Sequence, residues 1–596
     1  MTEPPSALAI AAAVSSGATS AVAVARDALA RVGDYHAIQP AVWITRLPPE
    51  DVLARAARVD ARVAAGEALP LAGVPFAIKD NLDLSGAPTT AACPEFAYVP
   101  DRSAVVVERL AAAGAVPLGK TNLDQFATGL NGTRSPYGAP TCVFNRAYVS
   151  GGSSSGSAVA VAAGLVAFAL GTDTAGSGRV PAAFNGLIGM KPTKGRWSTG
   201  GLVPACRSID CVTVLARDVA DARAIDRVAA GFDAADPWSR PPEDRGLAPR
   251  RVGVPRSDQR NFLGDPASAF LYERALAALA ATGAELVEVD LMPLQEAAQL
   301  LYGGPWVAER TAAAGALLDN RPDAIDPTVR AILEGGRSVS GTDVFRGQYR
   351  LAELKRTADA MWEGVDLLAL PTAPTIYRIA EMRAAPVMLN GNLGLYTNFV
   401  NLLDMTALAL PAGWRDNGTG FGITLIGPAW TDLGLLDAGE AYLAAAALPP
   451  APAIDTGGYM ETVKLAVVGA HLEGMPLHWQ LTSRDARAIG ATTTAPTYRL
   501  YAMANTAPPK PALVHDADGE GGGAAIAVEV YELDVAAFGS FVAEVPAPLA
   551  IGSVTLADGS VVKGFVSEPR ATQGARDITA LGGWRRYVEE LGGTSP

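Results

Sequence analysis

The sequence predicts an α/β protein, in which helices flank a central sheet, followed by a small second domain of α+β type. Short apolar, strand-like runs alternate with longer helical patterns as far as residue 448, and such alternation favours a helix-covered sheet. A proline-rich stretch over 449–458 then interrupts the chain, and strand-like composition follows it. We therefore expect a first domain over 1–448, a linker over 449–458 and a second domain over 459–596.

Length and composition limit the class of protein. A chain of 596 residues is too long for one ordinary domain, and a hydrophobic content of 49% is typical of a well-buried globular enzyme. The net charge of −13 argues against a nucleic-acid partner. The longest apolar run, 158–170, is too short to cross a bilayer, so we expect a buried helix there and no membrane association.

The few cysteines and the N-terminal residues bear on the compartment. The four cysteines form neither a metal-ligand pattern nor a disulfide framework. No basic stretch precedes the alanine-rich N-terminal segment, so a signal peptide is not expected. Together these observations predict a cytoplasmic protein.

The first part of the chain reads as helices followed by strands. Residues 1–65 carry alanine-rich helical patterns, with Thr19 and Ser20 as a first cap. An apolar strand then runs through GVPFAIKD and ends at Lys79. We expect a helix over 103–114 and a strand over 115–118 after it.

Later segments continue the alternation and define the second domain. In the first domain, we expect strands over 187–191, 283–289 and 367–370 and a helix over 343–362. In the second domain, we expect strands over 463–471 and 524–533.

Two glycine- and serine-rich loops predict a catalytic serine. The first loop is GGSSSGS at 151–157, and the second is GTDTAGSGR at 171–179, which presents Ser177 after a run of small residues. Small side chains let successive backbone N–H groups approach a developing anion closely. The pattern therefore indicates a serine nucleophile beside its own oxyanion hole.

The base that would activate this serine is predicted to be a lysine. None of the four histidines lies between His36 and His471, so both serine loops are far from any imidazole in the sequence. A buried lysine can lose its proton near neutral pH, at about 1.4 kcal/mol for each unit by which its pKa falls. Lys79, at the end of an apolar strand, fits this role. Lys120, in GKTN, resembles part of a phosphate-binding loop, but the full spacing of such a loop is missing.

The chain resembles the amidase signature family in four separated segments: GVPFAIKD, GGSSSGS, DTAGSGRVPA and GLIGMKPTKG. The resemblance implies the amidase signature fold, with a mixed central sheet, and a Ser–Ser–Lys triad without metal or cofactor. In this triad Ser177 is the nucleophile, and Ser153, on a cis peptide bond, connects it to Lys79. The residues that the resemblance places around the substrate are the backbone N–H groups of Thr174, Ala175, Gly176 and Ser177 as the oxyanion hole, with Gly129 and Asn131 lining the pocket.

Within this family, the chain is similar to allophanate hydrolases. These enzymes carry a tyrosine and an arginine eight residues apart that hold the substrate carboxylate, and Tyr302 and Arg310 match them. On composition alone, the two residues read as a loop aromatic and a solvated helix charge. The resemblance implies hydrolysis of allophanate to ammonia and carbon dioxide in urea degradation and nitrogen metabolism. It also implies a link to a separate biotin-dependent urea carboxylase, and we expect a homodimer.

The second domain supports the same resemblance. GAHLEGMPL and GARDITALGGWR look like segments of the C-terminal domain of allophanate hydrolases, which resembles the gamma-glutamyl cyclotransferase fold. The implied task is decarboxylation of the N-carboxycarbamate that the first domain forms, with His471 as the catalytic candidate. His478 fits the pattern more loosely. The alternative is a purely structural or dimerising domain.

Three other functions compete with this interpretation. An amidase for another small anionic amide, such as malonamate, would use the same triad. An ammonia-channelling component of a transfer-RNA amidotransferase would share the first domain but would not need the second. A non-catalytic binding module is disfavoured because Lys79, Ser153 and Ser177 are all present.

Overall fold

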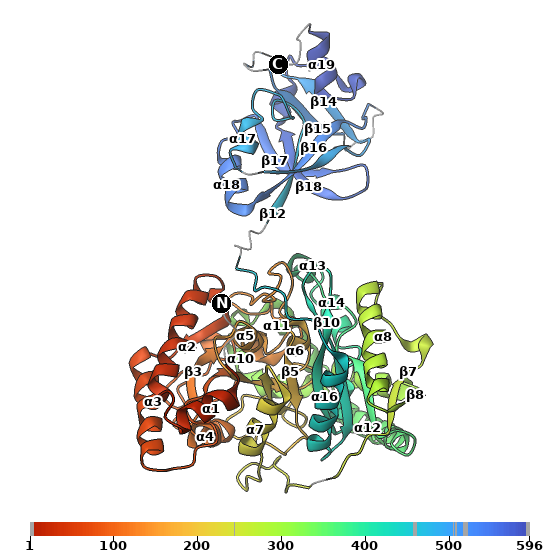
Figure 1. The fold of residues 1–596 in the computed structure, drawn as a ribbon. Coiled ribbons are helices and arrows are strands. Elements are labelled where there is room, and N and C mark those ends of the chain that lie inside the picture. Colours follow the sequence, from red (N-terminus) through yellow and green to blue (C-terminus); the bar gives the residue numbers. More distant parts are fainter. Residues whose placement is uncertain are drawn as a thin grey trace. The chain divides into compact units, whose positions relative to one another are not determined.

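The computed structural model describes residues 5–243, 245–456, 462–484, 486–504, 506, 509–516 and 522–591. The chain divides into two compact units, Met1–Gly457 and Gly458–Pro596, and each is described by itself (Figure 1). Residues 457 and 458 of the expected linker lie outside the described residues.

An eleven-stranded mixed sheet forms the centre of the first unit, in the order β1-β3-β2-β4-β6-β5-β10-β11-β9-β7-β8. Strands β2, β3 and β4 are parallel to one another, as are β7, β8 and β9, and the other neighbours are antiparallel. The predicted α/β class with a mixed sheet is confirmed. The strands are β1 (Trp43–Arg46), β2 (Pro75–Lys79), β3 (Val116–Thr121), β4 (Phe168–Asp173), β5 (Ile188–Lys191), β6 (Cys211–Ala216), β7 (Arg251–Pro255), β8 (Glu285–Val289), β9 (Leu367–Pro371), β10 (Met405–Trp414) and β11 (Gly420–Pro428).

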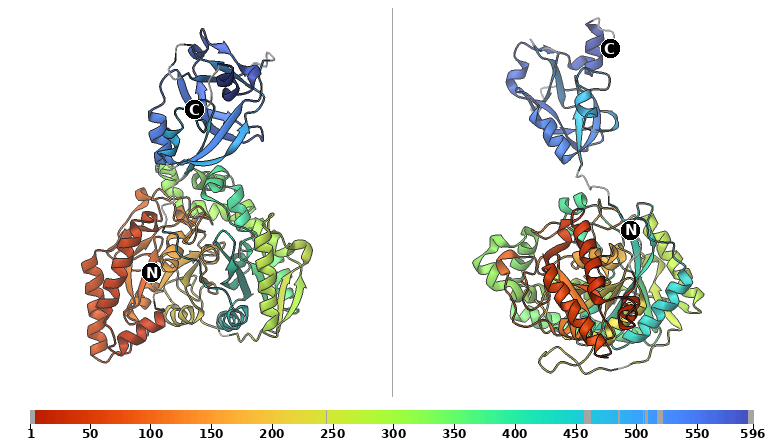
Figure 2. Two further views of the ribbon diagram at one scale, coloured as in Figure 1. Left: turned by 45° about the horizontal axis from the view of Figure 1, so that its top comes forward. Right: turned by 60° about the vertical axis from the view of Figure 1, so that its left-hand side comes forward.

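Helices surround this sheet, as Figures 1 and 2 show from three sides. Ser20 caps α2 as expected, because its hydroxyl accepts a hydrogen bond from Ala23 N over 3.0 Å. The helices are α1 (Ala7–Ser15), α2 (Ala21–His36), α3 (Pro49–Ala64), α4 (Val105–Ala112), α5 (Ser155–Ala162), α6 (Val180–Phe184), α7 (Val219–Ala229), α8 (Pro266–Ala281), α9 (Met292–Gly303), α10 (Trp306–Asn320), α11 (Pro327–Gly336), α12 (Gly341–Met361), α13 (Ile379–Ala384), α14 (Met388–Leu393), α15 (Phe399–Leu402) and α16 (Asp432–Ala446).

The apolar run over 158–170 is not one buried helix, and that prediction is wrong. Its first part belongs to α5, which ends at Ala162, and its last part begins β4. Between them Gly164 has a φ of +70°, a conformation that glycine adopts without steric cost and that ends the helix. Both elements are buried, so hydrophobicity alone did not separate helix from strand.

The parallel pairing of β2 and β4 brings the two predicted catalytic segments together. The register aligns Phe76 with Phe168 and Ile78 with Leu170, so both strands end at the same edge of the sheet. Lys79 closes β2, and the loop that carries Ser177 follows β4. Ligand sites of α/β sheets commonly lie at this carboxyl edge.

The second unit contains a five-stranded sheet in the order β13-β16-β12-β18-β17 and a three-stranded sheet in the order β15-β14-β19. The expected strand over 463–471 ends at Val467, and turns follow it. The elements are β12 (Thr462–Val467), α17 (Trp479–Thr482), β13 (Arg487–Thr493), β14 (Tyr498–Ala502), β15 (Pro511–His515), β16 (Ala527–Asp534), α18 (Val535–Ala543), β17 (Leu549–Thr555), β18 (Val561–Ser567), β19 (Arg576–Asp577) and α19 (Trp584–Glu590).

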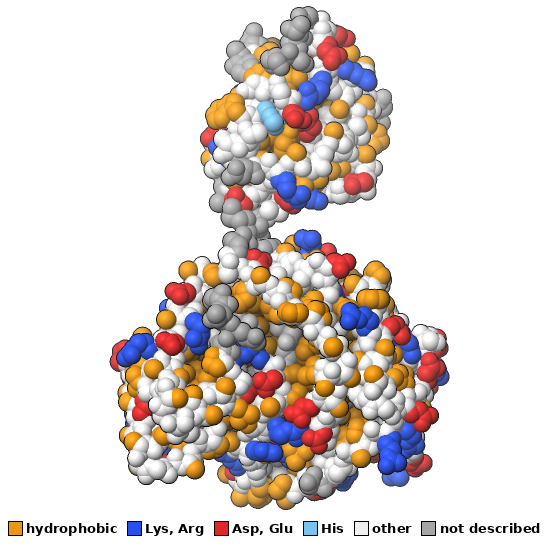
Figure 3. Space-filling view, viewed as in Figure 1, with side chains coloured by type: hydrophobic (Ala, Val, Ile, Leu, Met, Phe, Trp, Pro, Cys, Tyr) orange, Lys and Arg blue, Asp and Glu red, His pale blue; other side chains and the backbone are white. Residues whose placement is uncertain are grey.

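The surface and the helix lengths bear on possible partners. On the face drawn in Figure 3, acidic and basic side chains are interspersed over the first unit, so the net negative charge is not gathered there into one patch. Within the described ranges, no helix combines the length and the apolar character that a bilayer crossing needs.

Candidate active site

Lys79 lies completely buried at the end of β2, surrounded by hydroxyl groups. Its Nζ is 2.7 Å from Ser153 Oγ, 3.0 Å from Ser154 Oγ and 2.7 Å from Thr172 Oγ1. None of these partners carries a charge. The amine is therefore well hydrogen-bonded, and none of the described carboxylates contacts it directly, which favours its neutral form.

Burial lowers the pKa of Lys79 to about 7, because a desolvated ammonium is less stable than a neutral amine. The carboxylates of Asp124, Asp173 and Asp210 act in the opposite direction and favour the protonated amine. Asp210 is itself fully buried, and burial raises its pKa to about 6. Lys79 therefore titrates in the range where a general base works best.

Ser153 and Ser177 belong to the two glycine- and serine-rich loops. The Gly152–Ser153 peptide bond is cis, as the resemblance implies. Ser177 Oγ donates a hydrogen bond to Gly129 O over 3.4 Å, and no hydrogen bond joins the two serine hydroxyls in the described structure. Catalytic hydrogen bonds are often long before a substrate binds. The Lys79–Ser153 contact is thus formed, and the Ser153–Ser177 contact is not.

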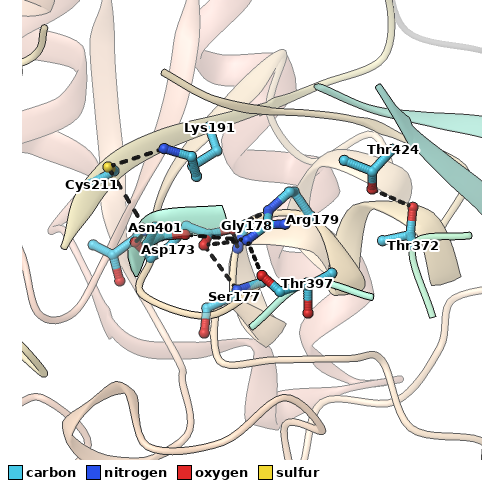
Figure 4. Close-up of polar contacts among 12 residues, drawn as sticks. Asp173, Ser177, Gly178, Arg179, Lys191, Cys211, Thr372, Thr397, Asn401 and Thr424 are labelled. Atoms are coloured by element: carbon cyan, nitrogen blue, oxygen red, sulfur yellow. Dashed lines mark hydrogen bonds and ion pairs between the residues drawn. The ribbon is translucent and has the colours of Figure 1, made fainter. Parts of the chain in front are cut away.

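The loop over 174–178 is held by a buried ion pair. Asp173 Oδ2 and Oδ1 accept from Arg179 Nε and Nη2, each over 2.9 Å, and neither side chain is exposed (Figure 4). Burial alone would raise the pKa of Asp173, but the Arg179 charge and its hydrogen bonds hold that pKa below its ordinary value. The same carboxylate also accepts from the backbone N–H groups of Gly176 and Gly178.

The N–H group of Gly176 therefore does not take the role that the sequence predicted. Its N–H, expected in the oxyanion hole, donates to Asp173 over 2.9 Å instead. The N–H groups of Thr174, Ala175 and Ser177 have no hydrogen-bond partner among the described residues. A Cβ at Gly176, where φ is +131°, would lie 2.6 Å from Thr397 Oγ1, so this glycine is required for packing.

Arg310 is a buried cation, not a solvated helix charge. It lies in α10, is 2% exposed, and donates through Nη1 to Thr128 Oγ1 and through Nη2 to Tyr302 Oη. In the described part of the chain it forms no ion pair with a carboxylate, and its buried Nε has no hydrogen-bond partner. The guanidinium lies 5.0 Å from the centre of the Tyr302 ring. A buried guanidinium without a paired carboxylate is suited to receive an anion.

A cavity of about 470 Å³ reaches this region and is lined by Leu130, Tyr302 and Asn390 among others. Asn390 Oδ1 accepts from Leu130 N and from Asn131 Nδ2, each over 2.8 Å. Asn131 is completely buried and is not one of the lining residues, so its side chain supports the cavity wall. A Cβ at Gly129 would lie 2.5 Å from Asp124 Oδ2, which explains the glycine beside Ser177.

In the second unit, the structure separates the two histidines that the sequence left open. His471 lines a cavity of about 190 Å³, and its Nε2 lies 2.7 Å from Gln480 Oε1. His478 does not line that cavity, and its Nε2 contacts the hydroxyl of Tyr531. His471 is therefore the better placed of the two for binding a ligand.

Comparison with known proteins places this site in a family. Residues 28–436 match the profile of the amidase family, described as "Amidase". The chain belongs to the amidase family. Residues 463–589 of this amidase match a second profile, described as "Allophanate hydrolase C-terminal domain".

Individual relatives of this amidase cover it to different extents. The urea amidolyase of Saccharomyces cerevisiae is 44% identical over 574 residues, which are 92% of this chain and 31% of that protein. This chain thus spans about a third of the length of that relative. The structure of an allophanate hydrolase from Kluyveromyces lactis is 42% identical, with a TM-score of 0.68, and the match covers 95% of this chain and 97% of the other. One component of the glutamyl-tRNA(Gln) amidotransferase of Symbiobacterium thermophilum is 38% identical over 468 residues, 72% of this chain and 93% of that one.

Four residues of the amidase site were not predicted from the sequence. Asp210 accepts from the Thr174 hydroxyl, and Asn401 Nδ2 donates to Asp173 O over 2.7 Å, so both brace the loop before Ser177. Thr172, which contacts Lys79, and Asn390 complete the set. Buried polar residues in otherwise apolar segments are the signal that could have pointed to Asn401 and Thr172.

Proposed function

We propose that the protein hydrolyses allophanate, and that Lys79, Ser153 and Ser177 form its catalytic triad. The observation that carries the choice of substrate is the buried guanidinium of Arg310, which lacks a paired carboxylate in the described structure and lies beside the Tyr302 hydroxyl. Allophanate has a carboxylate at one end and an amide at the other, so it satisfies both halves of such a site. The allophanate hydrolase of Kluyveromyces lactis, which the chain resembles in structure, supports this substrate.

The acylation step follows from the polar contacts. Neutral Lys79 takes a proton from Ser153 while Ser153 takes one from Ser177, and Ser177 Oγ attacks the terminal amide carbonyl. The backbone N–H groups of Thr174, Ala175 and Ser177 stabilise the oxyanion, and each such donor is worth about 10²–10³ in rate. The proton returns through Ser153 to the leaving ammonia. Water then cleaves the acyl-enzyme by the same route.

Substrate profiling with the purified full-length protein tests this proposal. Ammonia release is measured on allophanate, malonamate, urea and glutamine, with the Ser177→Ala and Arg310→Met variants beside the wild type. We expect allophanate to be the best substrate, and urea, which lacks the carboxylate, to be poor. Ser177→Ala should abolish turnover. Preference for malonamate would make the protein a different amidase, and equal losses of Arg310→Met on charged and neutral amides would remove the role of Arg310.

For the second unit, we propose decarboxylation of the N-carboxycarbamate that the first unit releases, with His471 in the active cavity. The match of residues 463–589 to the C-terminal domain of allophanate hydrolases and the position of His471 on the cavity wall support this role. Carbon dioxide release by full-length His471→Asn should lag behind ammonia release. Unchanged carbon dioxide kinetics would leave the unit with a structural role.

The cellular setting is part of the same proposal. The name of the longer relative, urea amidolyase, supports a link between this reaction and urea carboxylation by a biotin-dependent enzyme, which we expect on a separate chain. All four cysteines are buried free thiols, which suits a cytoplasmic location. We expect a homodimer, and sedimentation velocity of the purified protein at micromolar concentration would distinguish it from a monomer.

A further inference from the structure

The cavity of the second unit combines apolar walls with a small number of polar groups. Its polar side chains are His471, Gln480, Lys510 and Glu544, and most of the other lining residues are apolar. Small-molecule sites commonly have this composition, in which a few polar groups fix the orientation of the ligand.

The imidazole of His471 is held in one orientation by two aromatic rings. It stacks on Phe565, with ring centres 5.1 Å apart and planes 20° apart, and meets the edge of Phe541 at the same centre distance. Aromatic packing of this kind restricts rotation of the ring. The packing thus fixes the plane of the ring, and the contact with Gln480 places Nε2 on that side.

The hydrogen bonds around Gln480 determine which nitrogen of His471 carries the proton. Arg484 pairs with Glu544 Oε1 over 2.6 Å, so Glu544 is a carboxylate and can only accept hydrogen bonds. Glu544 Oε2 lies 3.2 Å from Gln480 Nε2, and the amide must turn its NH₂ group toward it. The amide oxygen of Gln480 then faces His471 Nε2 over 2.7 Å. Because an amide oxygen only accepts, the hydrogen must lie on His471 Nε2.

We propose that Gln480 is a positioning residue, which holds His471 as the Nε2–H tautomer so that Nδ1 can accept a hydrogen bond from the N–H group of a small carboxylated ligand in the cavity. Nδ1 has no hydrogen-bond partner among the described residues, and Lys510, on the same cavity wall, supplies a positive charge for the carboxylate. The identity of the ligand, N-carboxycarbamate, rests on the proposed function. The tautomer rests only on the contacts of Gln480.

Burial, together with nearby charges, favours the neutral form of the His471 ring. Burial lowers the pKa of His471, the Gln480 contact partly offsets this, and the nearby positive charges of Lys510 and His478 lower it further. Glu544 is paired with Arg484 and so contributes little net charge. Above its lowered pKa the ring is uncharged, and one nitrogen remains an acceptor at neutral pH.

Nitrogen-15 NMR of the full-length protein with labelled histidine tests the tautomer directly. The chain has four histidines, and His471→Asn assigns the signal of this one. At pH 7 we expect a protonated Nε2 and an unprotonated Nδ1. Gln480→Met keeps the volume but removes the acceptor, so the tautomers should mix. Gln480→Glu keeps an oxygen facing Nε2, and its carboxylate also raises the pKa of the ring, so it should restore the single Nε2–H tautomer only above that raised pKa. Gln573→Met, at an exposed glutamine of the same unit, is the matched control and should change nothing.

The outcomes of these measurements separate the role of Gln480 from the proposed reaction of the second unit. A protonated Nδ1 in the wild type, or a single Nε2–H tautomer in Gln480→Met, would overturn the role of Gln480. The consumption of N-carboxycarbamate is measured in parallel, and Gln480→Met should slow it at least tenfold. If the tautomer behaves as expected but no variant changes this consumption, the role of Gln480 stands and the proposed reaction of the second unit fails.

Discussion

In the proposed mechanism, the pH dependence of amide hydrolysis follows the protonation of Lys79. Only the neutral amine can accept the proton of Ser153, so activity is lost as the pH falls through the pKa of Lys79, which is about 7. With that value, about 90% of the lysine is neutral at pH 8 and about 10% at pH 6. We therefore expect kcat/KM to fall about tenfold between pH 8 and pH 6.

Variants of the acidic neighbour identify the group that titrates. Asp210 raises the pKa of Lys79, so Asp210→Asn should move the inflection of the profile to lower pH. Thr174→Val removes the hydroxyl that bonds to Asp210 but leaves the carboxylate in place. Because that hydroxyl lowers the pKa of Asp210, its loss makes the carboxyl easier to protonate, so the inflection should move in the same direction as in Asp210→Asn but by less. Lys79→Arg, which cannot act as a base, should lose about 10²–10⁴ in kcat.

The assay is ammonia release at subsaturating substrate between pH 6 and pH 8.5, with blanks for spontaneous breakdown. Allophanate and a neutral amide are both measured, because an inflection that belongs to the enzyme appears with either substrate. A flat profile over this range would refute the assignment of Lys79 as the base. So would an Asp210→Asn inflection that stays in place or moves to higher pH.

Three further changes test the supports of the site. Arg179→Met leaves the buried carboxylate of Asp173 unpaired and should lower the free energy of unfolding by about 3–5 kcal/mol in a urea titration; a loss below about 1 kcal/mol would contradict the importance of this pair. Gly176→Ala forces a Cβ against Thr397 in a backbone conformation that favours glycine, and kcat should fall at least tenfold, whereas wild-type kcat would show that the loop adapts. Asn390→Ala removes two hydrogen bonds from the cavity wall and should cost about 1–3 kcal/mol in kcat/KM; an unchanged value would exclude it from the site.

The sequence was sufficient for the class of fold and for fewer than half of the strands. Alternating patterns located β8 and β9 to within two residues, because short apolar runs bounded by polar turns are a local signal. The run over 158–170 failed, since a fully buried helix and a fully buried strand have the same hydrophobic composition. Strand order also lay beyond the sequence: β5 pairs with β10, more than 200 residues away.

The candidate site also contains some residues that sequence patterns predict and others that they do not. The positions of Lys79 and Ser177 were predicted because their glycine-rich and apolar surroundings are local features. The role of Asn390 was not, because its contact with Asn131 joins residues 259 positions apart. The bond from Gly176 N to Asp173 was missed for a different reason, since a glycine loop can direct its N–H groups either to a substrate or to its own chain.

The buried charge of Arg310 has a consequence for the stability of the protein. Among the described residues, the hydrogen-bond partners of the guanidinium are two hydroxyl groups, and the cost of its desolvation is part of the free energy of folding. A small dicarboxylate that binds only the folded chain would shift the unfolding equilibrium, by about 2.7 kcal/mol at a concentration of 100 Kd. The thermal unfolding temperature of the first unit should then rise with the concentration of such an anion, even one that cannot be hydrolysed. The residue that we propose to select the substrate would thus make the stability of the folded protein depend on the supply of that substrate.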